Sequence, residues 1–211
     1  MASDPELLEA WRAGDALAGE ALFERVYPSI ARFFANKVSG DPADLIQETF
    51  VACLQGRDRI DDPERFRSYV FGVAYNVLKR HYTKLHQDGE RFEFGSASVA
   101  DLGAGPLTWI VESGEQRLLL EALRRIPLRF QIVLELFYWE DLTSAAIADV
   151  LGEPHGTVRT RLRRARALLE QEIGRVDADP ELRSRTLSDL DAWAEGLRRA
   201  AFEDGVIKRP A

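Results

Sequence analysis

The sequence predicts an all-α protein made of two small helical domains, a flexible linker between them and a C-terminal helical extension. Apolar residues recur at helical spacing over most of the chain, and no stretch shows the alternation of a β-strand. One segment rich in Gly, Ser and Pro interrupts the pattern, as linkers do. The expected divisions are residues 1–85, the linker 86–112, residues 113–173 and the extension 174–211.

Composition limits the classes of protein that this chain can belong to. Its 211 residues suit one or two small domains, and no apolar run approaches the ~20 residues of a membrane span. The start, MASDPELLEAW, lacks the pattern of a signal peptide. A single cysteine, Cys53, excludes an intrachain disulfide and fits a reducing compartment. We therefore expect a cytoplasmic protein without a membrane span.

The sequence offers no constellation for catalysis or metal binding. Cys53 and the three histidines, His81, His86 and His155, lack metal-ligand spacing. Asp44 and Glu48 form the one pair of carboxylates suited to acid–base work, but no nucleophile or metal cluster accompanies them. We expect no cofactor, no metal and no enzymatic activity.

The N-terminal half is predicted to be helical over residues 5–38, 44–54 and the later part of 57–84. The helix 44–54 has two different faces. Its apolar face is expected to join the core, through Ile46, Thr49, Phe50 and Cys53. The opposite face carries Asp44, Gln47 and Glu48, and a wet acidic side is its simplest interpretation.

In the segment 57–84, a charged loop precedes a helix rich in aromatic and then basic residues. The expected packing residues are Phe66, Tyr69, Val70, Val73 and Val77. Two alternatives stay open for Tyr75, Asn76, Lys79, Arg80 and Tyr82. They form either a polar-aromatic surface that suits single-stranded nucleic acid, or an aromatic core with a basic end.

Residues 142–169 are predicted to form a short helix, a tight turn and a longer basic helix. Thr143 caps the first helix, Gly152 ends it, and Pro154 prevents it from continuing. The second helix starts at Gly156 and Thr157, and one apolar stripe runs along it, formed by Val158, Leu162, Ala165 and Leu169. The preceding helices should pack behind it through Leu128, Ile132, Val133, Leu136 and Phe137. This is the layout of a DNA-reading helix-turn-helix.

The remaining faces of that second helix are strongly basic. At about 100° per residue, the residues opposite or beside the apolar stripe are Arg159, Thr160, Arg161, Arg163, Arg164, Arg166 and Ala167. Between Pro154 and Leu169 there are five arginines and no acid, although the formal net charge of the chain is −7. A solvated face would include Glu for pairing with Arg, so the pattern favours contact with DNA.

Two blocks of the sequence resemble bacterial sigma factors. DPADLIQETFVACL with FRSYVFGVAYNVLKR is similar to their second conserved region. IPLRFQIVLELFYWEDLTSAAIADVLGEPHGTVRTRLRRAR is similar to the fourth. Together they cover residues 16–82 and 115–172, with only a short segment between them. The chain therefore resembles the extracytoplasmic-function (ECF) group of sigma factors of the sigma-70 family.

The resemblance implies a transcription initiation factor that binds core RNA polymerase and promoter DNA and helps to melt the start region. It implies that Asp44, Gln47 and Glu48 dock on the clamp helices of the largest polymerase subunit. The melted −10 strand would be held by Asn76, Lys79 and Arg80, together with the loop 57–64. The −35 element would be approached by Gly156, Thr157, Arg159, Thr160, Arg161, Arg163 and Arg164. An anti-sigma factor or other regulator is implied as a further partner.

The sequence departs from the family pattern at several positions. Ser144 and Ala146 stand where Tyr and Glu are usual, so the capping box with Thr143 is missing. Tyr69 replaces a frequent Trp, and Tyr75 stands where a basic residue is common.

Residues 174–211 lie beyond the minimal family plan. Asp179 and Pro180 should end the recognition helix, and an amphipathic helix is marked by Leu187, Leu190, Ala194, Leu197 and Ala201. This helix either packs on the second domain or serves as a regulatory tail. For the whole chain, the alternative function is a helix-turn-helix regulator with an amino-terminal sensory domain.

Overall fold

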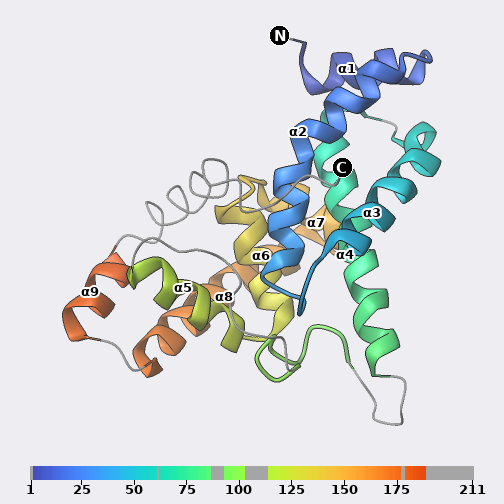
Figure 1. Ribbon diagram of the computed structural model, residues 1–211. Helices are drawn as coiled ribbons and strands as arrows, with labels where there is room; N and C mark the ends of the chain where they lie inside the picture. The colour runs from blue at the N-terminus through green and yellow to red at the C-terminus, as the bar shows by residue number, and fades with distance from the viewer. Residues whose placement is uncertain (1, 61, 87–92, 103–113, 177–178, 189–211) are drawn as a thin grey trace.

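The computed structural model describes residues 2–60, 62–86, 93–102, 114–176 and 179–188 (Figure 1). In these ranges the secondary structure is helical and contains no β-strand. The prediction of an all-α fold is confirmed. None of the described helices is long and apolar enough to cross a bilayer.

The first lobe contains the four helices α1 (Asp4–Arg12), α2 (Ala16–Ala35), α3 (Ala43–Gly56) and α4 (Phe66–Leu85). Two short 3₁₀ turns, η1 (Arg57–Arg59) and η2 (Pro63–Arg65), connect α3 to α4. Ser3 and Glu6 form a capping box at the start of α1, and Asp15 caps α2 by accepting from the Leu17 and Ala18 amides. These local signals set where the first two helices begin.

The second lobe contains α5 (Gly114–Arg125), α6 (Leu128–Tyr138), α7 (Ser144–Leu151), α8 (His155–Arg175) and α9 (Pro180–Ser188). The Thr143 hydroxyl accepts a hydrogen bond from the Ala146 amide at 3.1 Å, so the predicted cap of α7 is confirmed. Gly152 ends α7 in the left-handed conformation with φ of +64°. Only three residues then separate α7 from α8, which fixes the helix-turn-helix.

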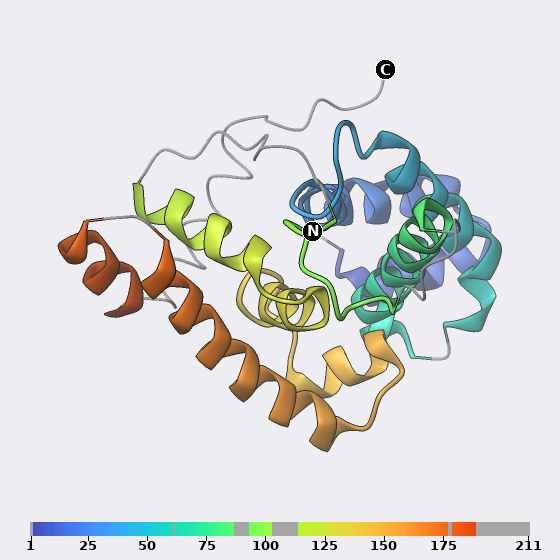
Figure 2. The same ribbon diagram turned by 90° about the horizontal axis from the view of Figure 1, so that it is seen from below.

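Helix α6 lies at the centre of the second lobe, with α5 and α8 beside it (Figure 2). Every residue from 130 to 136 is buried, so the predicted packing of Ile132, Val133 and Leu136 behind the helix-turn-helix is confirmed. The same prediction was wrong for Phe137, which is 39% exposed and lies edge-on against Tyr138. Phe137 sits in the last turn of α6, next to the half-buried Tyr138.

The aromatic core of the first lobe includes one residue whose position the sequence left open. Phe66, Val70 and Val77 are buried, as expected. Tyr82 is also buried, and its hydroxyl donates a hydrogen bond to the carbonyl of Lys37. Burial raises the pKa of Tyr82 to about 12. Tyr82 therefore belongs to the core and not to a polar-aromatic surface.

Part of the segment between the domains packs on the second lobe. The Leu128 amide donates to the Ala97 carbonyl at 2.9 Å, and the Arg129 amide donates to the Gly95 carbonyl at 3.2 Å. Val99 is fully buried, so residues 93–102 are anchored at the start of α6. The sequence pattern of small and polar residues gave no sign of this docking.

The extension begins with α9, which packs against α5 and α8. Leu182 lies against Gly114, Arg185 pairs with Glu115 at 3.1 Å, and Thr186 is fully buried. For residues 180–188, this supports the interpretation of a helix packed on the second domain. The positions predicted beyond Ser188 lie outside the described residues.

We expect replacement of Gly152 by Ala to lower the free energy of unfolding by roughly 1 kcal/mol, because a Cβ atom disfavours the left-handed conformation. A Cβ atom at this position would meet no atom within 4 Å, so the effect isolates the backbone. Gly174→Ala is the matched control, since its Cβ also meets open space but lies within a right-handed helix. Urea unfolding should show the first variant destabilised and the control unchanged or more stable; equal effects would contradict the assignment of the turn.

Candidate nucleic-acid and polymerase interfaces

Helix α8 separates an apolar side from a basic side. Val158, Ala165 and Leu169 are buried against the lobe, and Leu162 is half-buried. Six of the seven residues predicted to approach the −35 element are exposed: Gly156, Thr157, Arg159, Thr160, Arg163 and Arg164. The residue before the helix, Pro154, provides no side-chain cap; the Thr157 amide donates to the Pro154 carbonyl at 2.9 Å, and the His155 and Gly156 amides precede it without a capping side chain.

Arg161 is placed differently from the other arginines of α8. Its side chain is 17% exposed, and its Nη2 atom lies 2.5 Å from Oε2 of Glu153. Both groups lie close to Tyr75 of α4, where burial raises the pKa of the phenol. In this arrangement of the lobes, the charge of Arg161 is neutralised by a carboxylate.

Sequence reasoning missed two residues of the same surface. A shallow hollow of about 530 Å³ runs beside α8 and is lined by Arg129, Phe130, Gly156, Thr157, Thr160, Arg161 and Arg164. The guanidinium groups of Arg129 and Arg164 lie 5.0 Å and 5.8 Å from the centre of the Phe130 ring. The ring attracts both cations and holds them at one edge of the hollow. Arg129 comes from α6, so only the packing of α6 on α8 brings it here.

Ser144, one of the residues that depart from the family pattern, forms a hydrogen bond with His155 beside the turn between α7 and α8. The Ser144 hydroxyl and Nε2 of His155 lie 2.7 Å apart. This hydrogen bond joins the first residue of α7 to the first residue of α8. It connects α7 to α8 near the start of α7, where the capping box with Thr143 is missing.

The acidic face of α3 is exposed, as predicted, at Asp44, Gln47 and Glu48. Two apolar residues, Val51 and Leu54, continue this face and are 44% and 49% exposed. A helical projection of the sequence could have found them, since they lie seven and ten positions after Asp44. The face therefore combines carboxylates with exposed apolar surface. We call these five residues the α3 face.

The residues predicted for the −10 element are exposed on α4, and one of them touches the α3 face. Nη2 of Arg80 lies 2.8 Å from Oε1 of Glu48, and Lys79 is exposed beside it. Asn76 lies one turn earlier and lines a cleft of about 630 Å³ between α4 and α7. The structure thus brings the two predicted surfaces together at one ion pair.

The loop before α4 contributes charged groups to the same cleft. Arg59, Asp62 and Arg65 line it on the side of the first lobe, and Asp149 lines it on the side of α7. Nη1 of Arg65 lies 3.4 Å from the carboxylate of Asp149. The loop 57–64, which was expected to help hold a melted strand, therefore faces the helix-turn-helix.

The remaining candidates for chemistry are the thiol of Cys53 and side chains that could bind a metal. Burial raises the pKa of the Cys53 thiol to about 12, which keeps it protonated at neutral pH. No group of three His, Cys, Asp or Glu side chains suited to a metal occurs among the described residues.

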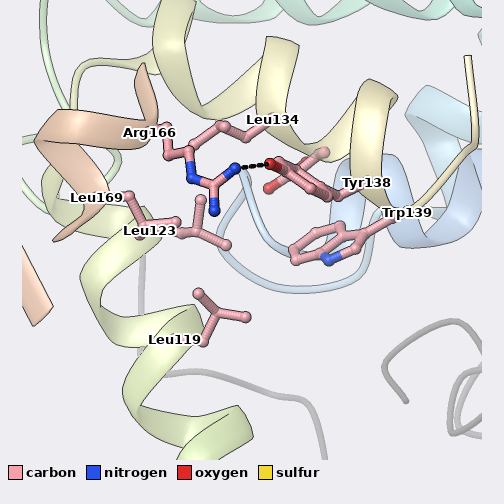
Figure 3. Close-up of a pocket in the computed structure, with 8 residues that line it drawn as sticks. Leu119, Leu123, Leu134, Tyr138, Trp139, Arg166 and Leu169 are labelled. Carbon is pink, nitrogen blue, oxygen red and sulfur yellow. Dashed lines mark hydrogen bonds between the residues drawn. The ribbon is translucent and has the colours of Figure 1, made fainter. Parts of the chain in front are cut away.

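A small apolar pocket between α5, α6 and α8 has about 20 Å³ of free space, enough for one water molecule (Figure 3). Nη1 of Arg166 donates to the Tyr138 hydroxyl there at 3.3 Å, and Arg166 also pairs with Glu170. These contacts draw Arg166 to the side of α8 and away from its exposed basic face.

Comparison with known proteins identifies both lobes. Residues 22–87 match the family model "Sigma-70 region 2", and residues 116–169 match "Sigma-70, region 4". The first match covers the half in which a sensory domain would lie, so the alternative of a conventional helix-turn-helix regulator is not favoured.

Similar proteins of known function agree with these matches. The chain is 30% identical over 139 residues to the RNA polymerase sigma factor HrpL of Pseudomonas syringae pv. syringae, covering 65% of this chain and 76% of HrpL. It is 25% identical over 182 residues to the ECF RNA polymerase sigma-E factor of Haemophilus influenzae, covering 81% and 95% of the two chains.

A solved structure, that of CnrH in complex with the cytosolic domain of CnrY, shares the fold. Its TM-score is 0.59 at 20% identity, with 82% of this chain and 99% of that chain covered. The order of two matched regions, the relatives and the exposed basic helix agree: the chain belongs to the ECF group of the sigma-70 family and is an RNA polymerase sigma factor.

Proposed function

We propose that this sigma factor uses three surfaces, on α3, α4 and α8, to bind polymerase, the −10 element and the −35 element. The assigned parts are residues 1–85 for polymerase and the −10 element, and 113–173 for the −35 element. The observation that carries this proposal is the basic row of α8. Arg159 and Arg163 are exposed and have no ion pair within the described ranges, although the chain as a whole is acidic.

The exposed side of α8 has the geometry of a helix that enters the major groove. Arg163 and Arg164 project from the middle of the helix, where they can reach guanine edges. The Thr157 hydroxyl and the neighbouring amides of His155 and Gly156 suit a phosphate. Arg129, held beside Arg164 by Phe130, adds a further cation at the edge of this surface and suits the DNA backbone.

The exposed end of α4 suits the melted −10 strand. Asn76 offers an amide to a base, and Lys79 and Arg80 offer charges to phosphates. Unstacking a base costs a few kcal/mol, which binding of the extruded base in a pocket can offset. Asn76 lines the cleft of about 630 Å³ between α4 and α7.

The α3 face suits a basic partner that also offers apolar surface. Asp44 and Glu48 supply negative charge, which orients and accelerates docking. Val51 and Leu54 supply apolar area that loses contact with water in the complex. This combination fits the clamp helices of the largest polymerase subunit.

Four further properties complete the proposal. The factor acts in the cytoplasm, where polymerase acts, and performs no covalent chemistry of its own. It is held inactive by an anti-sigma protein or another regulator, which the complex of CnrH with the cytosolic domain of CnrY supports by analogy. The extension 174–211 either stabilises the second lobe or docks such a regulator.

Run-off transcription tests the proposal as a whole. Core polymerase is incubated with a library of promoter fragments, with and without this chain. We expect specific transcripts only in its presence. Tight binding of duplex DNA by the chain alone, with no effect on polymerase, would overturn the proposal.

We expect Arg164→Ala to weaken −35 recognition by about 1–3 kcal/mol, or roughly 5- to 150-fold in affinity, through the loss of a base contact. Binding to core polymerase should not change. Arg166→Ala removes the same charge two residues further along α8, but Arg166 is turned toward Tyr138 and serves as the matched control. Competition binding of holoenzyme to promoter fragments measures both, and equal losses would show that α8 binds without reading bases.

We expect Asp44→Ala combined with Glu48→Ala to weaken association with core polymerase at least tenfold and to slow it, because the steering charge is lost. The exposed acids Glu9 and Glu20, replaced together by Ala, give the same change in net charge outside the α3 face. Association kinetics at low and high salt distinguish the pairs. If the control pair had the same effect, net charge and not the α3 face would be responsible.

A further inference from the structure

Glu153 differs from the other residues of the helix-turn-helix because it is the one acid in the sequence between Asp149 and Glu170. The five arginines of that stretch all follow it. It lies in the short turn between α7 and α8, directly after the left-handed Gly152 (Figure 2). Its amide donates to the Ala148 carbonyl at 3.0 Å, so the backbone of this turn is fixed to α7. A carboxylate thus has a defined place beside the basic helix.

The carboxylate of Glu153 pairs with Arg161 in a close and shielded contact. Nη2 of Arg161 lies 2.5 Å from Oε2 of Glu153, and the two side chains are 17% and 27% exposed. The pair of Arg166 with Glu170, further along α8, is 3.4 Å long, and both of its side chains are about half exposed. A shorter and better shielded contact holds its groups more firmly, because water competes less for them. Glu153 therefore fixes the direction of the Arg161 guanidinium group.

Arg161 keeps hydrogen-bond donors for DNA although it is paired. It lines the hollow beside α8, together with Thr157, Thr160 and Arg164. A guanidinium group has five N–H donors, and the bond to Glu153 uses one of them. This is the one hydrogen bond of the Arg161 side chain among the described residues. The remaining donors are available to DNA that enters the hollow, while the carboxylate offsets the positive charge.

A paired arginine and an unpaired arginine bind DNA differently. An unpaired guanidinium group attracts any phosphate, so it adds affinity without regard to sequence and makes binding fall steeply with salt. A guanidinium group beside a carboxylate attracts phosphates less, because the two charges cancel. Its planar fork can still donate two hydrogen bonds to O6 and N7 of one guanine, and its fixed direction reduces the entropy that is lost on binding. Pairing therefore favours the reading of a base over contact with the backbone.

We propose that Glu153 is a positioning residue that determines specificity: it holds Arg161 so that this arginine reads a guanine in the −35 element. The inference rests on the assignment of α8 to the −35 element in the proposed function. Glu153 also weakens the attraction of the helix-turn-helix for DNA of any other sequence. If the pair only tied the turn to α8, its loss would change stability but not the choice of base pair.

Glu153→Gln tests the inference, because the amide keeps the shape of the side chain and loses its charge. Glu170→Gln is the matched control, since it changes the net charge equally and breaks the pair with Arg166. Each full chain is assembled with core polymerase. The DNA probes are the promoter fragment selected by run-off transcription, fragments in which each −35 base pair is changed in turn, and a duplex without a promoter. Affinity is measured over a range of salt concentrations.

We expect Glu153→Gln to reduce the preference for a G·C pair at one position of the −35 element by about fivefold or more. Binding to the duplex without a promoter should become tighter. The slope of log affinity against log salt should become steeper by about 0.9, since one more cation contacts a phosphate. Glu170→Gln should leave every base preference unchanged, and neither variant should change binding to core polymerase.

Arg161→Lys is a second, independent variant. It keeps the positive charge but replaces the planar fork by a single ammonium group, so it should lose the preference at the same base pair. Combining it with Glu153→Gln should cause no further loss, because both changes act on one contact. Urea unfolding shows whether each variant is folded. If Glu153→Gln is not folded, the base preferences of Arg161→Lys decide the outcome.

Unchanged preference at every −35 base pair in the folded variants would overturn the inference. An equal loss of preference in Glu170→Gln would also overturn it, because net charge would then be responsible. These outcomes differ from a failure of the proposed function. A parent chain that does not bind core polymerase, or that selects no promoter, contradicts the proposed function. A parent chain that selects a promoter, with base preferences that survive both variants, contradicts only the role of Glu153.

Discussion

The structure depends on the burial of the middle of α6, residues 130–136, because a buried stretch of helix can carry polar groups only where partners reach them. α6 carries Gln131 and Glu135 in its buried stretch; Gln131 donates to Glu135 within the helix at 2.8 Å, but the charged partner of Glu135 comes from the other lobe. The ammonium group of Lys37 is supplied by the first lobe. The contact between the lobes is therefore built into the most central helix of the second one, and any motion that separates the lobes must rehydrate that carboxylate.

Positive and negative side chains gather on different surfaces of the molecule and are not spread evenly over it. Arginines gather on α8, carboxylates gather on the α3 face, and the net charge remains negative. An acidic surface elsewhere discourages indiscriminate binding to DNA, while local cations still contact phosphates. In this arrangement of the lobes, Arg80 pairs with Glu48 of the α3 face. Such an exposed pair is weak enough to exchange for DNA or polymerase.

The packing of the two lobes bears on how the surfaces proposed for the promoter can be reached. The residues proposed for the −35 element are exposed on α8 apart from Arg161, whereas Asn76, one of those proposed for the −10 element, lines the cleft against α7. A polymerase that binds each lobe at a separate place can supply the free energy needed to separate the lobes.

The sequence by itself determined the helices, the helix-turn-helix and the exposed faces of α3 and α8. Their signals act over a few residues: the Thr143 hydroxyl caps its own helix, and an apolar stripe predicts which side of α8 is buried. The resemblance of two sequence blocks to a family located the candidate surfaces. Tertiary structure alone decided the burial of Tyr82, the exposure of Phe137 and the pairing of Lys37 with a glutamate 98 residues later. Such outcomes depend on which distant element covers a side chain. The local periodicity of the sequence does not tell which element that is.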